Sequence, residues 1–342
     1  MLGLAKGKLY FCSISKECMI RNNYTREEVA AVYHLPMMEL LYKAATVHRE
    51  HHDPREVQMS TLLSIKTGGC PEDCAYCPQA ARYNTGVKGE GLMKEEDILA
   101  AAAQAKEGGS SRFCMGAAWR EVKDNVHFDR VVQVVEKVND MGLEVCCTLG
   151  MLTASQAQRL KEAGLHSYNH NIDTSREYYE RIISTRTFDD RMNTIDHVRK
   201  AGLRVCSGGI VGMGETEEDR IGFLWTLATM EKHPDSVPIN ALVAVEGTPL
   251  EDQVRIPFWD MLRTIASARI LMPASMVRLS AGRLTLSEAE QALCFLAGAN
   301  SIFTGEKLLT TPNPSQSDDL ALLAMLGMKP RPAFKDAEPV TH

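Results

Sequence analysis

The chain has 342 residues, of which 44% are hydrophobic, so it can bury a large core. Its formal net charge of −6 and isoelectric point near 6.0 give no basic surface of the kind that nucleic acids or anionic membranes attract. No apolar run reaches the roughly 18 residues of a membrane span, and the first 20 residues lack the compact apolar segment of a signal peptide. These properties favour a cytoplasmic protein with a small-molecule partner, in a compartment where thiols stay reduced.

The amino-terminal part of the chain divides into two segments. Residues 1–18 follow no periodic pattern, and we interpret them as a disordered tail or an extension from an upstream start codon. Residues 19–56 are predicted to form a helical cap. Within it, residues 25–52 read as one helix that begins at Thr25, a residue type that caps helices, and carries acidic residues in its first turn. We expect this helix to close the bottom of the domain that follows.

Three cysteines follow in a short loop. Cys70, Cys74 and Cys77 are spaced C-x3-C-x2-C, with no fourth cysteine or histidine nearby. Three thiolates can hold three irons of a 4Fe-4S cluster and leave the fourth iron free for a ligand other than protein. The alternative is structural zinc, which requires four protein ligands. The nearest histidines, His51–His52 and His127, lie well outside the loop, so the spacing favours an iron-sulfur cluster with an open iron.

A repeating unit then predicts the fold. From Met93 onward, an amphipathic helix, a glycine that ends it and a short β-rich run recur, most clearly around Gly142, Gly164 and Gly202. Eight strands are predicted, in residues 61–66, 111–115, 237–243, 276–279 and 300–303 and beginning near residues 143, 166 and 203. Eight alternating units are typical of a closed (β/α)8 barrel of the TIM type, which we place at residues 57–311.

The alternation of side chains along these strands predicts a second cluster of thiols. In residues 143–147 the apolar Leu143 and Val145 should face the helices, which turns Cys146 into the barrel and Cys147 outward. The same argument turns inward the residues Cys114, Cys206 and Arg278. Three inward thiols at strand ends favour a 2Fe-2S cluster, although each one alone could be a small buried apolar residue. Arg278 could instead pair with Glu144 or donate to cluster sulfur.

A polar set lies on one face of another predicted strand. Asn169, Asn171 and Asp173 alternate along residues 168–173, and two amides with a carboxylate suit a ligand that carries hydroxyl or ureido groups. A hydrogen-bonded polar layer inside the barrel would give the same pattern. Residues 312–342 then form a short carboxy-terminal segment, whose last dozen residues we expect to be loose because prolines interrupt them.

The cysteine loop, with an aromatic residue before its last cysteine and a barrel strand ahead of it, resembles the radical S-adenosylmethionine enzymes, and residues 25–329 resemble the biotin synthase family among them. The motifs that carry the resemblance lie in residues 60–82, 112–119, 168–174, 206–216, 277–283 and 310–314. The resemblance implies that Cys70, Cys74 and Cys77 ligate a 4Fe-4S cluster with S-adenosylmethionine, and that Cys114, Cys146, Cys206 and Arg278 ligate a 2Fe-2S cluster. One departure is the doublet Cys146–Cys147, where a slipped strand would exchange the two roles.

The resemblance also implies contacts to small molecules. S-adenosylmethionine would meet Tyr76, Asn171, Asp173 and Arg191, and the substrate dethiobiotin would meet Asn169, Asn171 and Asn240. The implied reaction is a radical sulfur insertion that converts dethiobiotin to biotin, the last step of biotin biosynthesis, which makes the protein a sulfurtransferase. An electron donor such as flavodoxin or ferredoxin would be a partner, and the enzyme would be a homodimer.

Three alternatives remain from the sequence. Another radical enzyme on this barrel, such as a hydrogenase-maturation or methylornithine-forming relative, would not require the strand cysteines. Lipoyl synthase would need an additional amino-terminal cysteine cluster, for which Cys12 and Cys18 are too few. An iron-sulfur electron carrier or zinc-stapled binding protein would leave the converging strand-end residues without a purpose.

Overall fold

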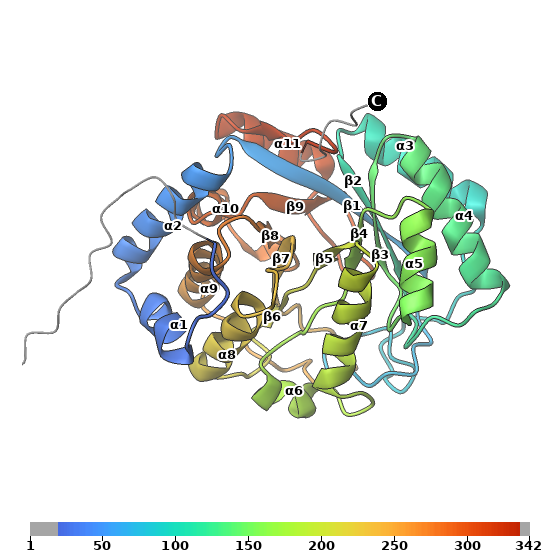
Figure 1. The fold of residues 1–342 in the computed structure, drawn as a ribbon, viewed down its shortest axis with the longest axis horizontal. Helices are drawn as coiled ribbons and strands as arrows, with labels where there is room; N and C mark the ends of the chain where they lie inside the picture. Colours follow the sequence, from blue (N-terminus) through green and yellow to red (C-terminus); the bar gives the residue numbers. More distant parts are fainter. Residues whose placement is uncertain (1–19, 336–342) are drawn as a thin grey trace, which may run out of the picture.

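The structure, a computed structural model, describes residues 20–335 and is built around a closed barrel of eight parallel strands (Figure 1). The barrel strands are β1 (Glu56–Lys66), β2 (Arg112–Ala117), β3 (Glu144–Thr148), β4 (Ser167–Asn169), β5 (Arg204–Cys206), β7 (Ser236–Ala241), β8 (Met276–Leu279) and β9 (Ser301–Thr304). β9 pairs with β1 and closes the barrel, and the short β6 (Gly209–Val211) pairs only with β7. The predicted (β/α)8 fold is therefore confirmed. Residues 1–18, with Cys12 and Cys18, lie outside the described part of the chain.

Helices between the strands form the outer layer. They are α3 (Glu95–Glu107), α4 (Val126–Asp140), α5 (Ala154–Glu162), α6 (Arg176–Ile182), α7 (Phe188–Lys200), α8 (Glu217–Ala228), α9 (Phe258–Leu271), α10 (Glu288–Leu296) and α11 (Gln316–Met325), with a 3-10 turn η1 at Arg283–Thr285. The three glycines predicted to end helices do so: Gly142, Gly164 and Gly202 have φ of 80°, 84° and 72°, the left-handed region that glycine tolerates best.

The amino-terminal helical segment differs from the prediction in two ways. It is broken into α1 (Arg26–Tyr33) and α2 (Met37–His51), because Pro36 cannot donate an N–H and disfavours helix in the residue before it. Thr25 does cap α1, as predicted, in a reciprocal pair with Glu28. The two helices pack along α8 and α9 in the outer layer (Figure 1). The prediction that they close the bottom of the barrel was therefore wrong.

The amino ends of the strands are covered instead by the carboxy-terminal segment. β10 (Lys329–Pro330) pairs with the start of β1, and the Phe334 N–H donates to Glu144 Oε1 at 2.9 Å. The Phe334 ring packs edge-on against His166, with centroids 5.7 Å apart. Residues 331–335, predicted to be loose, are thus held by contacts that no local sequence pattern signals. Residues 336–342 lie beyond the described range.

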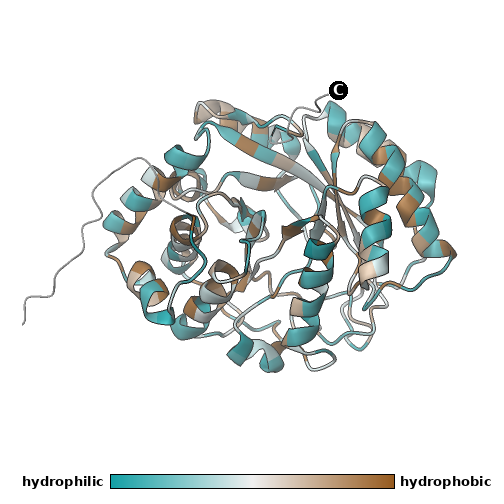
Figure 2. Ribbon diagram, in the orientation of Figure 1, coloured by the Kyte–Doolittle hydropathy of each residue, from teal (hydrophilic) through white to brown (hydrophobic). Residues whose placement is uncertain are grey.

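The hydrophobic core fills the space between strands and helices. Phe113, Val145 and Val205 point from the strands into this layer and are at most 2% exposed. Figure 2 shows hydrophilic residues over much of the outer helices and hydrophobic residues among the strands. Within residues 20–335, no helix is both long enough and apolar enough to cross a bilayer.

Candidate functional site

A cavity of about 320 Å³ opens at the carboxyl ends of the barrel strands. The predicted site residues that line it are Cys70, Cys74, Tyr76, Cys77, Cys114, Cys146, Asn169, Asn171, Asp173, Arg191, Asn240 and Arg278. Cys206 does not line it directly, because the Asn169 amide covers its sulfur and donates to Cys206 Sγ at 3.2 Å. The fold thus brings every predicted site residue to one end of the barrel, the end where this fold places its chemistry.

The cysteine loop follows β1 and closes on itself through its backbone. The Cys70 N–H donates to Gln79 O at 2.9 Å, and the Ala81 N–H donates to Cys70 O at 2.8 Å. Gly68 begins the loop with φ 66°, and a Cβ there would lie 2.4 Å from Lys88 O. Only glycine fits this turn, so the loop conformation is built into the local sequence.

One carboxylate anchors this loop to the segment after α6. Asp73 Oδ1 accepts the backbone N–H groups of Ser184 and Thr185 at 2.9 and 3.1 Å and the Thr185 hydroxyl at 2.9 Å. The Ser184 hydroxyl donates to Asp73 Oδ2. Burial raises the pKa of Asp73, but these hydrogen bonds outweigh burial and lower it to about 2. The anchor fixes the loop relative to the segment that carries Arg186 and Arg191.

The loop thiols lie among cations. Burial and the neighbouring Cys74 raise the pKa of the Cys77 thiol to about 12, so it stays protonated unless a metal or a cation compensates the thiolate charge. Arg186 Nη2 lies 3.7 Å from Cys74 Sγ, and Arg186 Nε is buried without a hydrogen-bond partner in the described residues. The nearest carboxylate oxygen, Glu72 Oε2, lies 3.8 Å from Nε, within ion-pair distance but too far for a hydrogen bond, so an anionic iron-sulfur cluster would fit beside this guanidinium.

The strand cysteines meet inside the barrel as the alternation predicts. Cys114 and Cys146 are register partners on β2 and β3, so both side chains point the same way, and they pack together in a small cluster with Phe303. Cys147 joins the outer core, with the valines that face the helices. The strand has therefore not slipped, and Cys146 is the member of the doublet that faces the cavity.

Arg278 is a buried cation without a carboxylate within ion-pair distance in the described chain. It is 1% exposed, and its Nε donates to Ser301 Oγ at 2.9 Å while Nη2 lies 3.3 Å from Gln58 Oε1 and from Ser60 Oγ. The partner suggested for it from the sequence, Glu144, pairs instead with Arg112, with Nη2 to Oε2 at 2.7 Å. Because an unpaired buried cation is costly, a negatively charged group beside Arg278 fits this arrangement.

Arg112 places a second positive charge at the same thiols. A hydrogen bond with Cys146 lowers the pKa of Cys114, and the Arg278 and Arg112 guanidinium groups lower it further. Arg112 Nη1 is buried and has no hydrogen-bond partner among the described residues. The three thiols and two arginines therefore suit an anionic cluster, and the donor set fits a 2Fe-2S centre.

Polar side chains span the space between the two sets of thiols. Asp173 Oδ2 accepts from the Tyr76 hydroxyl at 3.0 Å and from Arg191, whose Nε donates to Tyr179 at 2.9 Å. Asn171 Oδ1 accepts from the Gly208 N–H at 3.1 Å. The Asn240 amide donates to Gly209 O at 2.9 Å and accepts from the Ala281 N–H at 3.2 Å. The backbone orients these amides before any ligand binds.

Sequence reasoning missed three residues of the site. Arg186 lies in a loop, where no periodicity signals its direction. Arg112 was predicted only as part of a strand run, although it shares the inward face of that strand with Cys114. His170 lines the cavity although alternation would turn it outward, because β4 ends at Asn169 and the chain leaves the strand there. Burial, with Arg191 and Arg186 nearby, lowers the pKa of His170 far below its usual value, so its imidazole is neutral.

The zinc alternative finds no support in this geometry. In residues 20–335, no three histidine, cysteine or acidic side chains converge closely enough to hold one metal ion. The eight described cysteines are all free thiols. A cluster, in which each thiol binds a different iron, fits separated thiols better than a single ion does.

Comparisons with known proteins agree with these features. Residues 64–224 match the family model of the radical SAM superfamily, and residues 238–329 match that of the Biotin and Thiamin Synthesis associated domain. The chain is 64% identical to the biotin synthase of Cytophaga hutchinsonii over 319 residues, which cover 93% of this chain and 95% of that protein. It is 59% identical to the mitochondrial biotin synthase of Arabidopsis thaliana over 313 residues, which cover 91% of this chain and 83% of that protein.

Two solved structures share the fold at low identity. A methylornithine synthase aligns with a TM-score of 0.75 and 20% identity, covering 90% of this chain and 95% of its own. The FeFe-hydrogenase maturase of Carboxydothermus hydrogenoformans aligns with a TM-score of 0.75 and 15% identity, covering 90% of this chain and 76% of its own. At these identities the likeness concerns the fold alone.

Proposed function

The chain belongs to the biotin synthase family of radical S-adenosylmethionine enzymes, and we propose that the barrel cavity is where it inserts sulfur into dethiobiotin to form biotin. The observation that carries this proposal is that one cavity is lined by the three loop thiols and by the strand thiols of Cys114 and Cys146, with polar side chains between them. A reaction that combines radical formation with sulfur donation needs both within reach of one substrate.

Cys70, Cys74 and Cys77 would hold the 4Fe-4S cluster, and Cys114, Cys146, Cys206 and Arg278 would hold the 2Fe-2S cluster. When bound, the first supplies the electron that cleaves S-adenosylmethionine to methionine and a 5′-deoxyadenosyl radical, and the second supplies the sulfur. The protein would position both at the same end of the barrel. The orphaned nitrogens of Arg186 and Arg112 support cluster sites at these two places.

Arg191, Asp173 and Tyr76 would bind S-adenosylmethionine. Asp173 uses Oδ2 for its contacts to Tyr76 and Arg191, so its second oxygen is available to a ribose hydroxyl. Arg191 uses two of its five N–H groups on Asp173 and Tyr179, which leaves donors for a carboxylate. These roles use the geometry already set by hydrogen bonds between the side chains.

Asn169, Asn171 and Asn240 would bind dethiobiotin, and Asn171 would also contact S-adenosylmethionine. A ureido group carries one carbonyl and two N–H groups, which amide side chains match with both donors and acceptors. The backbone contacts of Asn171 and Asn240 support a fixed orientation of these amides. Rigid amides limit the positions from which the radical can take hydrogen from the substrate carbons.

We also propose the wider setting of the enzyme. Residues 57–311 would form the catalytic barrel, with residues 19–56 and 312–342 as flanking segments. A flavodoxin or ferredoxin would supply the electron, and the enzyme would act as a homodimer in the cytoplasm. The dimer rests on the family resemblance.

The test is anaerobic reconstitution with iron and sulfide, followed by addition of reductant, S-adenosylmethionine and dethiobiotin. We expect biotin and 5′-deoxyadenosine to appear together. An enzyme that carries both clusters and cleaves S-adenosylmethionine but forms no biotin would contradict the proposed substrate. One that carries the loop cluster but forms no 5′-deoxyadenosine would contradict the proposed chemistry.

A further inference from the structure

A second hollow, of about 290 Å³, lies on the outside of the cysteine loop. Its lining comes from the loop itself, from the end of β1, from the segment after β2 and from the start of α4: Lys66, Gly69, Pro71, Ala118, Trp119, Arg120, Glu121, Lys123, Asn125 and His127. Ala118 and Trp119 line both this hollow and the barrel cavity, so they form a wall between the two. The hollow is therefore a surface feature next to the loop and separate from the space for substrate.

The hollow is positively charged on a protein that is negative overall. Three cations, Lys66, Arg120 and Lys123, face a single exposed carboxylate, Glu121, whereas the whole chain has a formal net charge of −6. Asn125 caps the amino terminus of α4 at its edge, which adds the partial positive charge of a helix end. A local positive field on an acidic protein selects for an acidic partner at this place.

Two of these cations are not neutralised by a near carboxylate. Lys66 Nζ donates only to the carbonyls of Gly68 and Ala118, and Lys123 is exposed with no ion pair or hydrogen bond to residues 20–335. Arg120 lies 3.6 Å from the buried Glu72. The charge that remains is therefore available to a partner that approaches from outside.

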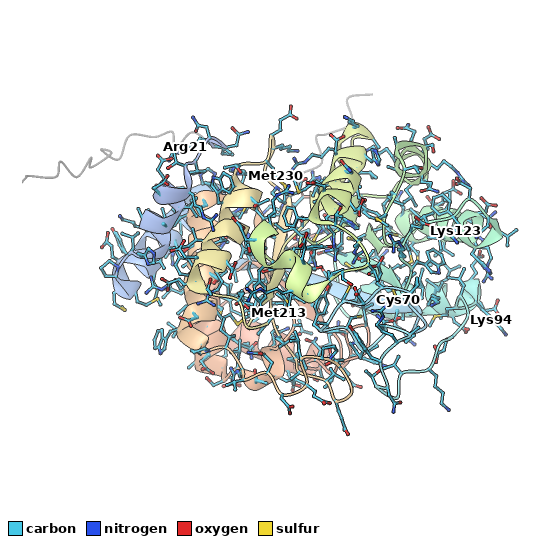
Figure 3. The ribbon with its side chains drawn as sticks, turned by 90° about the horizontal axis from the view of Figure 1, so that it is seen from below. Arg21, Cys70, Lys94, Lys123, Met213 and Met230 are labelled. Carbon is cyan, nitrogen blue, oxygen red and sulfur yellow. The ribbon has the colours of Figure 1, made fainter. Side chains whose placement is uncertain are left out.

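Two residues of the cysteine loop reach solvent at this hollow. Gly69 and Pro71 line it and are exposed, whereas the thiols of the loop line the barrel cavity, where Cys70 and Cys77 are partly exposed and Cys74 is buried. Figure 3 shows Cys70 and Lys123 on the same side of the molecule. A donor seated here would contact the two residues that flank Cys70 in the chain.

We propose that this hollow is the docking surface for an acidic one-electron carrier protein. The inference rests on the proposed function, because a radical S-adenosylmethionine enzyme must receive an electron from outside for each cleavage. The carrier is oxidised by one electron, the iron-sulfur site held by Cys70, Cys74 and Cys77 is reduced by one electron, and no proton or group moves. Weak redox encounters bury little surface, so charge steers them more than packing does.

The test uses three charge variants of the full, reconstituted chain. Lys123→Glu should weaken binding of reduced flavodoxin of strongly negative net charge and slow its one-electron oxidation, about threefold or more at low ionic strength. Glu121→Lys should speed the same reaction. Lys161→Glu is the matched control, since exposed Lys161 lies in the last turn of α5, at the opposite end of the barrel. Affinity of the reconstituted proteins for oxidised flavodoxin, measured by isothermal titration calorimetry, gives a readout that does not depend on activity.

A small uncharged reductant separates this proposal from the proposed function. With photoreduced 5-deazariboflavin, all three variants and the parent protein should form 5′-deoxyadenosine and biotin at equal rates. The docking proposal is overturned if the flavodoxin rates of Lys123→Glu and Glu121→Lys equal that of the parent, or if Lys161→Glu slows the reaction as much as Lys123→Glu. Failure of the parent to make biotin with the uncharged reductant would instead overturn the proposed function. A slower flavodoxin reaction in Lys123→Glu and a faster one in Glu121→Lys, both returning to the parent rate at high salt, would support the docking surface.

Discussion

Replacement of Asp73 by alanine tests how the cysteine loop is held. The carboxylate accepts four hydrogen bonds from Ser184 and Thr185. Asp73→Ala leaves two backbone N–H groups without their acceptor, while the two hydroxyls can turn to other acceptors, Glu72 among them. At about 1–2 kcal/mol for each partly buried N–H, the loss of stability is about 2–4 kcal/mol. The unfolding entropy expected for a chain of this size converts this loss to a fall in Tm of about 3–6 °C.

The functional effect of the same change should be selective. Once the loop is free of its anchor, Cys70, Cys74 and Cys77 no longer have fixed positions relative to Arg186. The 4Fe-4S cluster of the loop should therefore be lost, while the strand thiols should still bind the 2Fe-2S cluster. Calorimetry gives the Tm, and iron content with visible absorbance after anaerobic reconstitution separates the two clusters. Asp252→Ala, which changes an exposed carboxylate, is the control. A variant that unfolds like the parent and loads the full iron content would refute the anchoring role.

The other predictions concern the clusters, a buried ion pair and a buried histidine. Cys70→Ala should abolish S-adenosylmethionine cleavage, because it removes one ligand of the open cluster; substantial 5′-deoxyadenosine after reconstitution would contradict the assignment. Cys206→Ala should reduce biotin yield more than 5′-deoxyadenosine, because it affects the sulfur donor; a normal biotin yield would rule that role out. Glu144→Gln leaves Arg112 as an uncompensated buried cation and should cost about 3–5 kcal/mol in urea unfolding, with partial recovery in the double variant with Arg112→Met; a loss below about 1 kcal/mol would contradict the argument. Burial, with Arg269 nearby, lowers the pKa of His48 to about 3, so its imidazole stays neutral in the folded protein. In the unfolded chain the same imidazole takes up a proton below about pH 6.5, so folding stability is lost as the pH falls from about 6.5 toward 3. This histidine should contribute about 2 kcal/mol of the loss between pH 7 and 5, and His48→Leu should flatten the dependence; an unchanged slope in the variant would refute it.

Local sequence patterns correctly predicted those helix ends that depend on the conformation of a single residue. The glycine-terminated helices appear where Gly142, Gly164 and Gly202 predict them, because a left-handed cap is a property of one residue. The single helix predicted over residues 25–52 was wrong at Pro36, where the proline itself carried the signal. The position of the helices along α8 and α9 had no such signal, since an amphipathic helix does not specify which surface it covers.

The residues of the candidate site also fall into those that a local pattern predicts and those that it does not. Alternation along a strand correctly turned Cys146 inward and Cys147 outward, because strand geometry fixes the face of each side chain. It failed at His170, one residue beyond the end of β4, where that geometry no longer applies. Arg186 could not be assigned to the site in advance, because its contact to Cys74 joins segments far apart in the chain. Arg112 could have been, because the alternation that turns Cys114 inward also turns inward the residue two positions before it.

The sequence by itself determined the three-cysteine loop, the alternating units of the barrel and the inward direction of the strand thiols, since each depends on spacing within a few residues. Only the tertiary structure decided what surrounds them. It paired Glu144 with Arg112 and left Arg278 without a carboxylate in the described residues, and it drew residues 329–335 across the amino ends of the strands. It also gathered Lys66, Arg120 and Lys123 outside the cysteine loop. These arrangements depend on long-range contacts, which closure of the barrel sets and no local pattern encodes.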